Sequence, residues 1–554
     1  MIRPQGDLGA NADGNSQEEI LKFLENAKTF GGKAVTRHDT HAAVIFLAGD
    51  RAIKIKRAVR FPFLDYSTAR KRKAACCAEL DANRRFAPQL YRGVVPITRE
   101  ADGHLALNGS GKPIEWAVDM RRFDETKTLD LLIDRGELAD SLLDQLGPII
   151  ASMHENAPSV DAESWLDAIQ TYIAQNTRAF REHGDLFPYR ATEKLDHDLH
   201  VAYLRLRPIL VGRGGLGLIR RGHGDLHLGN IALTDGKPVA FDALEFDPIM
   251  ASGDVLYDLA FLLMDLVERG YQRAANMVFN GYFSATQRIE DLDGIVALPF
   301  FMSLRAAIRA KVAAARFDLP DVKDRMEVAH SARRYFQLAL TLLKPRRPMI
   351  VCIGGLSGTG KTVLARALAP FLLPFPGALI LRSDIERKSM FHVAQTDRLT
   401  PDHYRPSASE QVYRALNQKA GQVVRAGHSV IVDAVFVEPQ QRTAIEMMAA
   451  NAGIVFCGLF LVADLHTRLR RVGGRGPDAS DADATTVRTQ EKASTGSIAW
   501  TIIDASRSPE ETVVTARIAL KTLVGDGIVQ LDNEKVTSAG RSPALPSSSR
   551  RGQR

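Results

Sequence analysis

The sequence lacks the features that would assign it to a membrane, secreted or zinc-binding class. No apolar run approaches the roughly 18 residues that a membrane-spanning helix needs. The N-terminal residues MIRPQGDLGANADGNSQEE contain no apolar core of a secretory signal. The four cysteines, Cys76, Cys77, Cys352 and Cys457, show no CxxC or Cys/His ligand spacing. These absences predict a cytoplasmic protein with no membrane partner, no structural disulfide and no zinc site.

A strong excess of one charge is also missing. The chain carries 72 Lys and Arg against 65 Asp and Glu, a formal net charge of +7. Such a mixture differs from the one-sided basic surface of nucleic-acid-binding proteins, and phosphate-handling sites need arginine and lysine in any case. We therefore expect no nucleic-acid partner. The sequence leaves the oligomeric state open.

What the sequence does contain is, first, the motif His223-Gly-Asp-Leu-His-Leu-Gly-Asn230. Phosphoryl transfer to a hydroxyl needs a carboxylate that orients the acceptor and ligands for magnesium, which kinase loops supply from an Asp and an Asn five residues later. Asp225 and Asn230 have this spacing. The residues 231–241 predict strand, turn and strand, and Asp242 follows where a second magnesium ligand is expected. A polar turn in which Asp225 caps a helix is the alternative interpretation.

This motif with its following Asp resembles the aminoglycoside phosphotransferase family of kinase-like small-molecule kinases, over about residues 30–340. The resemblance implies that Asp225 is the catalytic base, that Asn230 and Asp242 bind Mg2+, and that His223 braces the loop. His227 lies within the motif without an assigned role. Because the same fold also phosphorylates choline, homoserine and sugars, the resemblance implies a small-molecule acceptor without specifying which one.

Residues upstream of the motif provide a cation for the nucleotide. Apolar or alternating runs at 42–46 and 52–56 flank Gly49 and predict a β-hairpin, and residues 67–85 predict a helix. Lys54 resembles the strand lysine that binds the ATP phosphates in kinases, with Glu79 on the helix as its partner. Lys56 is an alternative phosphate-binding lysine, because it lies on the same face of the strand. A second alternative is that both lysines are solvated residues of an edge strand. No Gly-x-Gly-x-x-Gly precedes this strand, which weakens a protein-kinase interpretation.

Further carboxylates follow Asp242. Asp254 and Asp258 are four residues apart and share one face of a predicted helix. They suit either a cationic substrate or capping and hydrogen bonding, and we favour the structural role.

The second motif is Gly355-Leu-Ser-Gly-Thr-Gly-Lys-Thr362, a P-loop preceded by an apolar strand at 349–354 and followed by a helical pattern at 363–372. Its glycines let backbone N–H groups face the phosphates, its lysine reaches the β- and γ-phosphates, and its threonine offers a hydroxyl to magnesium. The predicted nucleotide-binding residues are Gly355, Ser357, Gly358, Thr359, Gly360, Lys361 and Thr362. Asp433 ends a strand at 428–433 as a Walker B acid does and is a metal-site candidate, with capping of the next helix as the alternative.

Three features favour phosphoryl transfer over mechanical ATP hydrolysis in this second domain. Asp384 follows another strand, with Arg387 three residues later, which is similar to gluconate- and shikimate-kinase-like enzymes and to zeta-toxin-like kinases. The resemblance implies that Asp384 orients an acceptor hydroxyl as a catalytic residue and that Arg387 holds the acceptor. Arginines also precede a Gly-rich acidic segment, as in a phosphate-binding lid, although a solvated helix face is the alternative. They are Arg468, Arg470, Arg471 and Arg475. Finally, no Leu-Ser-Gly-Gly-Gln string marks a transporter-type ATPase.

The length of 554 residues suits about three folding units. We expect an α+β kinase-like two-lobed domain followed by an α/β P-loop NTPase domain with a parallel sheet. The predicted boundaries are a disordered N-terminus at 1–16, the aminoglycoside-phosphotransferase-like domain at 17–343, a linker at 344–348, the P-loop kinase-like domain of AAA type at 349–530 and a disordered tail at 531–554.

The predicted function is ATP-dependent phosphotransfer to a small-molecule hydroxyl, with ATP and Mg2+ at both sites. Two other classes stay open. One is a regulatory ATPase in which one domain senses nucleotide, and the other is a polynucleotide or protein kinase.

Overall fold

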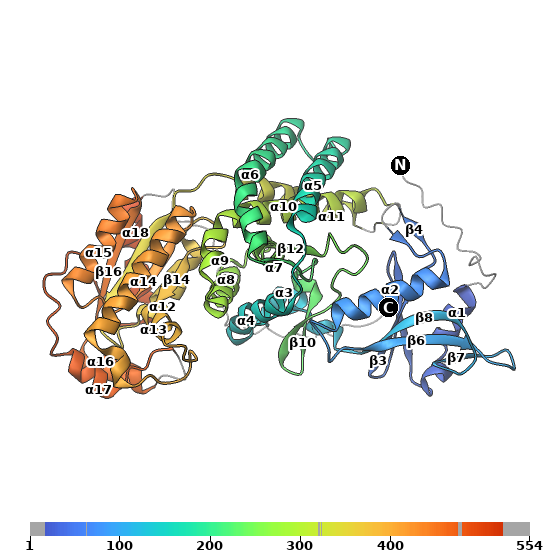
Figure 1. The fold of residues 1–554 in the computed structure, drawn as a ribbon, viewed down its shortest axis with the longest axis horizontal. Helices are drawn as coiled ribbons and strands as arrows, with labels where there is room; N and C mark the ends of the chain where they lie inside the picture. The colour runs from blue at the N-terminus through green and yellow to red at the C-terminus, as the bar shows by residue number, and fades with distance from the viewer. Residues whose placement is uncertain (1–16, 62–63, 320–321, 323, 475–478, 525–554) are drawn as a thin grey trace, which may run out of the picture.

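The computed structural model describes residues 17–61, 64–319, 322, 324–474 and 479–524. Along them the chain forms a small mixed lobe, a helical lobe and an α/β domain, which follow one another from right to left in Figure 1. None of the helices in these ranges combines the length and the apolar character needed to cross a membrane. The boundaries drawn from the sequence stay a prediction.

The small lobe is built on a six-stranded antiparallel sheet in the order β1-β2-β3-β8-β6-β7. The predicted hairpin is confirmed as β2 and β3, and Gly49 turns between them at φ +60°, a conformation that favours glycine. The predicted helix at 67–85 is α2, which Thr68 caps by accepting a hydrogen bond from Lys71 N. The elements are α1 (Gln17–Glu25), η1 (Ala27–Phe30), β1 (Val35–Asp39), β2 (Ala43–Ala48), β3 (Arg51–Lys56), β4 (Arg60–Phe61), β5 (Leu64–Asp65), α2 (Ala69–Asn83), β6 (Tyr91–Arg99), β7 (Leu105–Leu107) and β8 (Lys112–Arg121).

The helical lobe surrounds α7, a helix whose sequence VLYDLAFLLMDLVE is buried along nearly its whole length. Apolar side chains on all faces of one helix indicate a position at the centre of a core. The strand, turn and strand predicted at 231–241 are confirmed as the hairpin of β10 and β11. The elements are η2 (Glu125–Lys127), α3 (Leu129–Asp134), α4 (Asp140–Asn156), α5 (Ala162–Glu182), α6 (Tyr189–Gly215), β9 (Ile219–Arg221), η3 (Leu228–Asn230), β10 (Ile231–Thr234), β11 (Lys237–Ala240), β12 (Ser252–Asp254), α7 (Val255–Glu268), α8 (Gln272–Thr286), α9 (Ile289–Gly294), η4 (Ile295–Ala297), α10 (Leu298–Phe317) and α11 (Arg325–Leu342).

The last domain has a five-stranded parallel sheet in the order β14-β15-β13-β16-β17. The helix after the P-loop is shorter than the predicted 363–372, since α12 ends at Leu368 and a 3₁₀ turn follows. The elements are β13 (Met349–Gly355), α12 (Lys361–Leu368), η5 (Ala369–Phe371), β14 (Leu379–Arg382), α13 (Ser383–Met390), η6 (Pro401–Tyr404), α14 (Pro406–Arg425), β15 (Val430–Asp433), α15 (Pro439–Asn451), β16 (Val455–Val462), α16 (Leu465–Gly473), α17 (Ala484–Gln490), β17 (Thr501–Asp504) and α18 (Pro509–Val524).

The two faces of this parallel sheet belong to different hydrophobic clusters. Val351 and Ile353 of β13 pack in a cluster that includes residues of α12 and α18. Ile350 and Cys352, which point the other way, join a cluster that continues through α14 into the helical lobe. The α/β domain and the helical lobe are therefore joined by continuous apolar packing.

Candidate active sites

The first site centres on the catalytic loop, residues 223–230. Asn230 Nδ2 donates hydrogen bonds to the carbonyl and to Oδ2 of Asp225, both at 2.9 Å. His227 Nε2 lies 3.4 Å from the same Oδ2, while its Nδ1 accepts from Gly229 N. Burial would raise the pKa of Asp225, but the contact with His227 outweighs it and lowers the pKa to about 2. The predicted base is therefore ionised at neutral pH and directed by its neighbours.

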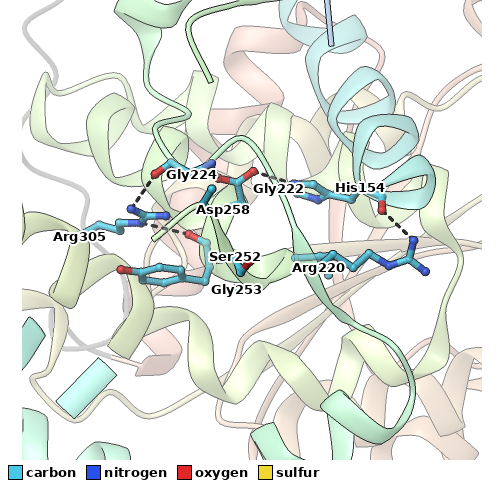
Figure 2. Close-up of a pocket in the computed structure, with 11 residues that line it drawn as sticks. His154, Arg220, Gly222, Gly224, Ser252, Gly253, Asp258 and Arg305 are labelled. Atoms are coloured by element: carbon cyan, nitrogen blue, oxygen red, sulfur yellow. Dashed lines mark hydrogen bonds and ion pairs between the residues drawn. The ribbon is translucent and has the colours of Figure 1, made fainter. Parts of the chain in front are cut away.

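The loop is anchored by Asp258 of α7, which Figure 2 shows beside Gly224. Asp258 accepts hydrogen bonds from the backbone N–H groups of His223 and Gly224, at 2.8 and 3.0 Å, and contacts His154 Nε2 at 3.3 Å. Arg305 donates to the Gly224 carbonyl at 3.0 Å. The contacts with these groups hold the Asp258 pKa well below its usual range although burial acts in the other direction. Asp258 thus has a structural role, and Asp254 likewise caps α7 and pairs with Arg213.

His223 connects the catalytic loop to the segment that carries Asp242. Its Nε2 lies 2.9 Å from the carbonyl oxygen of Phe241, the residue before the candidate metal ligand. Burial lowers the pKa of His223 and favours the neutral ring, so Nε2 donates this hydrogen bond. This geometry matches the bracing role that the sequence predicted for it.

The candidate phosphate-binding lysine contacts both of its expected neighbours. Lys54 Nζ lies 2.8 Å from Glu79 Oε1 and 2.7 Å from Asp242 Oδ1. Lys56, two residues along β3, shares Glu79 at 2.5 Å but pairs instead with Glu245 at 2.5 Å. Two ammonium groups around one buried carboxylate lower the pKa of Glu79 against the effect of burial. Only Lys54 contacts the candidate metal ligand.

The residues of the first site fit a magnesium ion held largely through nucleotide phosphates. Asp242 offers a half-exposed carboxylate, and Asn230 an amide oxygen, on segments joined by the β10–β11 hairpin. Hard oxygen donors of this kind suit Mg2+, which is usually bound by one or two protein carboxylates together with phosphates and water. Among the described residues no group of three His, Cys, Asp or Glu side chains is arranged to hold a metal.

The second site is the P-loop between β13 and α12. Gly355, Gly358 and Gly360 adopt φ values of +133°, +86° and +96°. A Cβ atom at Gly358 would lie 2.7 Å from the carbonyl oxygen of Arg468. At this position both the backbone conformation and the space require glycine. The loop therefore has the tight curvature that directs backbone N–H groups toward a phosphate at the start of α12.

The candidate metal residues of the P-loop domain lie side by side. Thr362 Oγ1 donates to Asp433 Oδ2 at 2.6 Å, and Arg382 Nε lies 3.7 Å from the same carboxylate oxygen. Lys361 Nζ is 3.4 Å from the Leu356 carbonyl within the loop. A hydroxyl and a carboxylate in contact at the carboxyl edge of the sheet are the ligand pair that a P-loop offers to Mg2+.

Asp384 stands at the start of α13, beyond the end of β14. Burial raises its pKa and Asp433 acts in the same direction, whereas Arg382 and Lys361 lower it. A carboxylate with a raised pKa beside the P-loop lysine suits the predicted contact with an acceptor hydroxyl. Arg387, by contrast, donates to the His403 carbonyl at 2.7 Å and to Ser409 Oγ at 3.2 Å. It joins η6 to the first turn of α14, and its role in acceptor binding stays a prediction.

The arginines of the predicted lid have different positions. Arg468 is buried, with its Nε 3.0 Å from the Ser357 carbonyl and its Nη1 paired with Glu491. The expectation that Arg468 lines a lid is therefore corrected: it braces the P-loop against α17. Arg471 lies at the rim of the loop, where it contacts the carbonyls of Thr359 at 3.4 Å and Arg507 at 2.8 Å. Arg475 lies outside the described residues.

Several contacts were not predicted from the sequence. Gln490 Oε1 accepts from the Ser357 N–H of the P-loop at 2.8 Å. Asp265 accepts from Leu228 N in the catalytic loop at 3.0 Å, and Glu245 pairs with Lys56. The recurrence of Asp at 254, 258 and 265 along one helix was the available signal for Asp265. A lone glutamine more than 100 residues from its partner has no such signal.

Comparison with known families agrees with the two sites. Residues 42–292 match the model of the phosphotransferase enzyme family, and residues 349–495 match an AAA domain. The chain joins a kinase-like phosphotransferase domain to a P-loop kinase domain. Both domains are of types that act with ATP, which agrees with the predicted fold class and with the two motifs.

Relatives and solved structures cover one or both domains. Uncharacterized proteins of Mycobacterium tuberculosis (strain ATCC 25618 / H37Rv) and Mycobacterium bovis (strain ATCC BAA-935 / AF2122/97) are each 29% identical over 454 residues, 80% of this chain and 87% of theirs. A choline kinase from Cryptosporidium parvum Iowa II is 11% identical, covering 60% of this chain and 96% of its own, with a TM-score of 0.37. A gluconokinase from Sinorhizobium meliloti 1021 is 19% identical, covering 32% and 94%, with a TM-score of 0.24.

Proposed function

We propose that this protein is a bifunctional small-molecule kinase that transfers the γ-phosphate of MgATP to a hydroxyl group at each of two sites. The proposal rests on one contact in each domain. In both, the candidate metal ligand contacts the residue that phosphoryl transfer requires beside it. In the first site Lys54 contacts Asp242 at 2.7 Å, and in the second Thr362 contacts Asp433 at 2.6 Å.

In the first site, Asp225 would accept the proton of the attacking hydroxyl. Asn230 holds its carboxylate from one side, which leaves the orientation of the base defined. Lys54 would bind the α- and β-phosphates while Glu79 keeps its ammonium group in place. Asn230 and Asp242 would hold Mg2+, which would neutralise phosphate charge when bound.

In the second site, the backbone N–H groups of the P-loop and Lys361 would bind the phosphates. Thr362 and Asp433 would hold Mg2+, whose charge would offset that of the transferred group. Asp384 lies where it can orient an acceptor, and its raised pKa favours proton exchange with a hydroxyl.

The proposal is tested by incubating the purified chain and two variants with MgATP and a pooled metabolite extract. Asp225→Asn removes the base of the first site without changing its shape, and Lys361→Ala removes the phosphate-binding lysine of the second. Mass spectrometry then detects metabolites that gain one phosphoryl group. We expect at least two products, one lost only in Asp225→Asn and one lost only in Lys361→Ala.

Thermal unfolding of each variant is the control for folding. An unfolded variant would lose the products of both sites, whereas a folded variant should lose only one. Phosphate release from ATP without any phosphorylated metabolite would contradict the proposal and indicate a regulatory ATPase. A single product lost in both folded variants would contradict independent kinases and indicate one reaction that needs both sites.

A further inference from the structure

Helix α8 contacts both catalytic domains. On its side toward the P-loop domain, Asn280 Oδ1 accepts from Ile380 N at 2.7 Å and its Nδ2 donates to the Ala378 carbonyl at 3.2 Å. Asn276 Nδ2 donates to the same carbonyl at 3.0 Å. These side chains occupy the free edge of β14, the outermost strand of the parallel sheet, as a further strand would. Since β14 leads directly into Arg382 and Asp384, α8 positions the start of the second site.

On its other side α8 supports the catalytic loop of the first site. Tyr282 OH lies 3.1 Å from His154 Nδ1, and His154 Nε2 lies 3.3 Å from Asp258 Oδ2. Asp258 in turn accepts the backbone N–H groups of His223 and Gly224. All three side chains of this chain are buried. A loop movement that displaces Asp258 would therefore leave a buried polar group without its partner unless Tyr282 followed.

The two sides of α8 meet at a cleft between the domains. Arg288, just after α8, donates from Nη2 to Tyr282 OH at 3.2 Å. Arg288 and Arg382 both line this cleft of about 490 Å³, part of which is open to solvent. Arg382 is the residue whose Nε lies 3.7 Å from Asp433, the partner of Thr362. Apart from this cleft, polar contacts run without a break from the catalytic loop to the P-loop.

The hydrogen bonds of this path have one consistent direction. Arg288 can only donate to Tyr282 OH, so the tyrosine proton is free to donate to His154 Nδ1. His154 then carries its own proton on Nε2 and donates it to Asp258. A single arrangement of protons thus satisfies the path from Arg288 to Asp258, and removing the tyrosine hydroxyl breaks it at two points.

We propose that α8, through Tyr282 and Asn280, couples the two nucleotide sites, so that occupancy of one changes the affinity of the other. The inference rests on the proposed function in requiring that both sites bind MgATP. Mg2+ held by Asp433 in the second site would compete with the contact between Asp433 and Arg382 at one wall of the cleft. Nucleotide binding that displaces the catalytic loop would also displace Asp258 and Tyr282 at the other wall, because hydrogen bonds through His154 join them. Continuous apolar packing across the interface means that neither wall can move alone.

The test is calorimetric titration with Mg2+ and a non-hydrolysable ATP analogue. Lys54→Met weakens the first site and Lys361→Ala the second, so the tighter binding phase of each variant yields the intrinsic affinity of its intact site. The coupling factor is the product of the two stepwise constants of the unmodified chain divided by the product of these intrinsic constants. We expect a factor that differs from unity by about fivefold or more. In a Tyr282→Phe background the factor should return to within about twofold of unity.

Tyr203→Phe is the matched control, because its buried hydroxyl donates to the Leu166 carbonyl, away from α8. It should leave the coupling factor unchanged. Should Tyr282→Phe unfold, Asn280→Ala cuts the other side of α8 and should bring the same factor closer to unity. Two binding sites with a coupling factor of one in the unmodified chain would overturn the inference while leaving the proposed function intact. Failure of both single-site variants to bind the analogue would overturn the proposed function instead.

Discussion

Two lysines of β3 compete for the role of binding ATP in the first site, and one pair of substitutions separates them. Lys54 and Lys56 lie on the same face of the strand, and each contacts Glu79. They differ in the second partner, which is Asp242 for Lys54 and Glu245 for Lys56. Since Asp242 is the candidate magnesium ligand, we expect Lys54 to contact the phosphates. Lys56 joins the lobes through Glu245, and Tyr66 OH lies 3.4 Å from the same carboxylate oxygen.

Methionine replaces either lysine with a side chain of similar length and no charge. Loss of a charge-assisted contact is worth about 1.5–3 kcal/mol, so Lys54→Met should weaken ATP binding at the first site by about 10- to 100-fold. Lys56→Met should change this affinity by less than about threefold, because it removes no phosphate contact. Breaking a buried ion pair costs about 3–5 kcal/mol when no partner remains. Glu79 keeps one lysine in each variant, so both should lose less stability than this.

The assay is calorimetry with MgATP in a Lys361→Ala background, which removes the second site, together with urea unfolding of each variant. The matched positions on one strand make each lysine the control for the other. A larger loss of ATP affinity in Lys56→Met than in Lys54→Met would refute the reasoning and assign the phosphate contact to Lys56.

Three other predictions concern the second domain. Gly358→Ala forces a Cβ to 2.7 Å from the Arg468 carbonyl oxygen at φ +86°, so ATP binding to the P-loop should weaken by about tenfold or more while the first site is unchanged in calorimetry. Thr362→Val removes the 2.6 Å hydrogen bond to Asp433 and should abolish the gain in ATP affinity that Mg2+ gives this site; an unchanged gain would exclude Thr362 as a ligand. Burial lowers the pKa of His428 from 6.5 to about 4, so its contribution to stability is complete above pH 6.5 and falls by about 3 kcal/mol as the pH drops toward 4. In urea unfolding, the free energy of unfolding of His428→Asn should fall less between pH 6.5 and pH 4 than that of the unmodified chain. An equal fall would show that other groups cause it.

Local motifs allowed much of both sites to be predicted from the sequence. The hairpin carrying Lys54, the helix carrying Glu79 and the strand before Gly355 are all signalled by nearby residues. The contact between Asp225 and Asn230 could be predicted from their spacing, because five residues in a tight loop leave few ways to place them. The β10–β11 hairpin likewise carries Asp242 back to the site.

Other parts depend on contacts between distant segments. Strand β6 has the sequence YRGVVPITR, in which Gly93 and Pro96 weaken the strand pattern, and it forms through pairing with β8. The burial of Arg468 depends on α17, which the sequence does not place beside the P-loop. Asn276 and Asn280 are residues typical of a solvated helix face. Only the fold shows that β14 lies beside them. Such contacts arise from the way the domains pack, which residue spacing does not encode.

The central claim is that one chain holds two separate sites for MgATP. The most direct measurement is the number of MgATP molecules bound per chain at saturation, by equilibrium dialysis of the unmodified protein and of Lys54→Met and Lys361→Ala. At an ATP concentration that saturates both sites of the unmodified protein but lies well below the dissociation constant of the substituted site, the account predicts two per chain for the unmodified protein and one for each variant. One molecule per chain in the unmodified protein, lost completely in either variant, would contradict it.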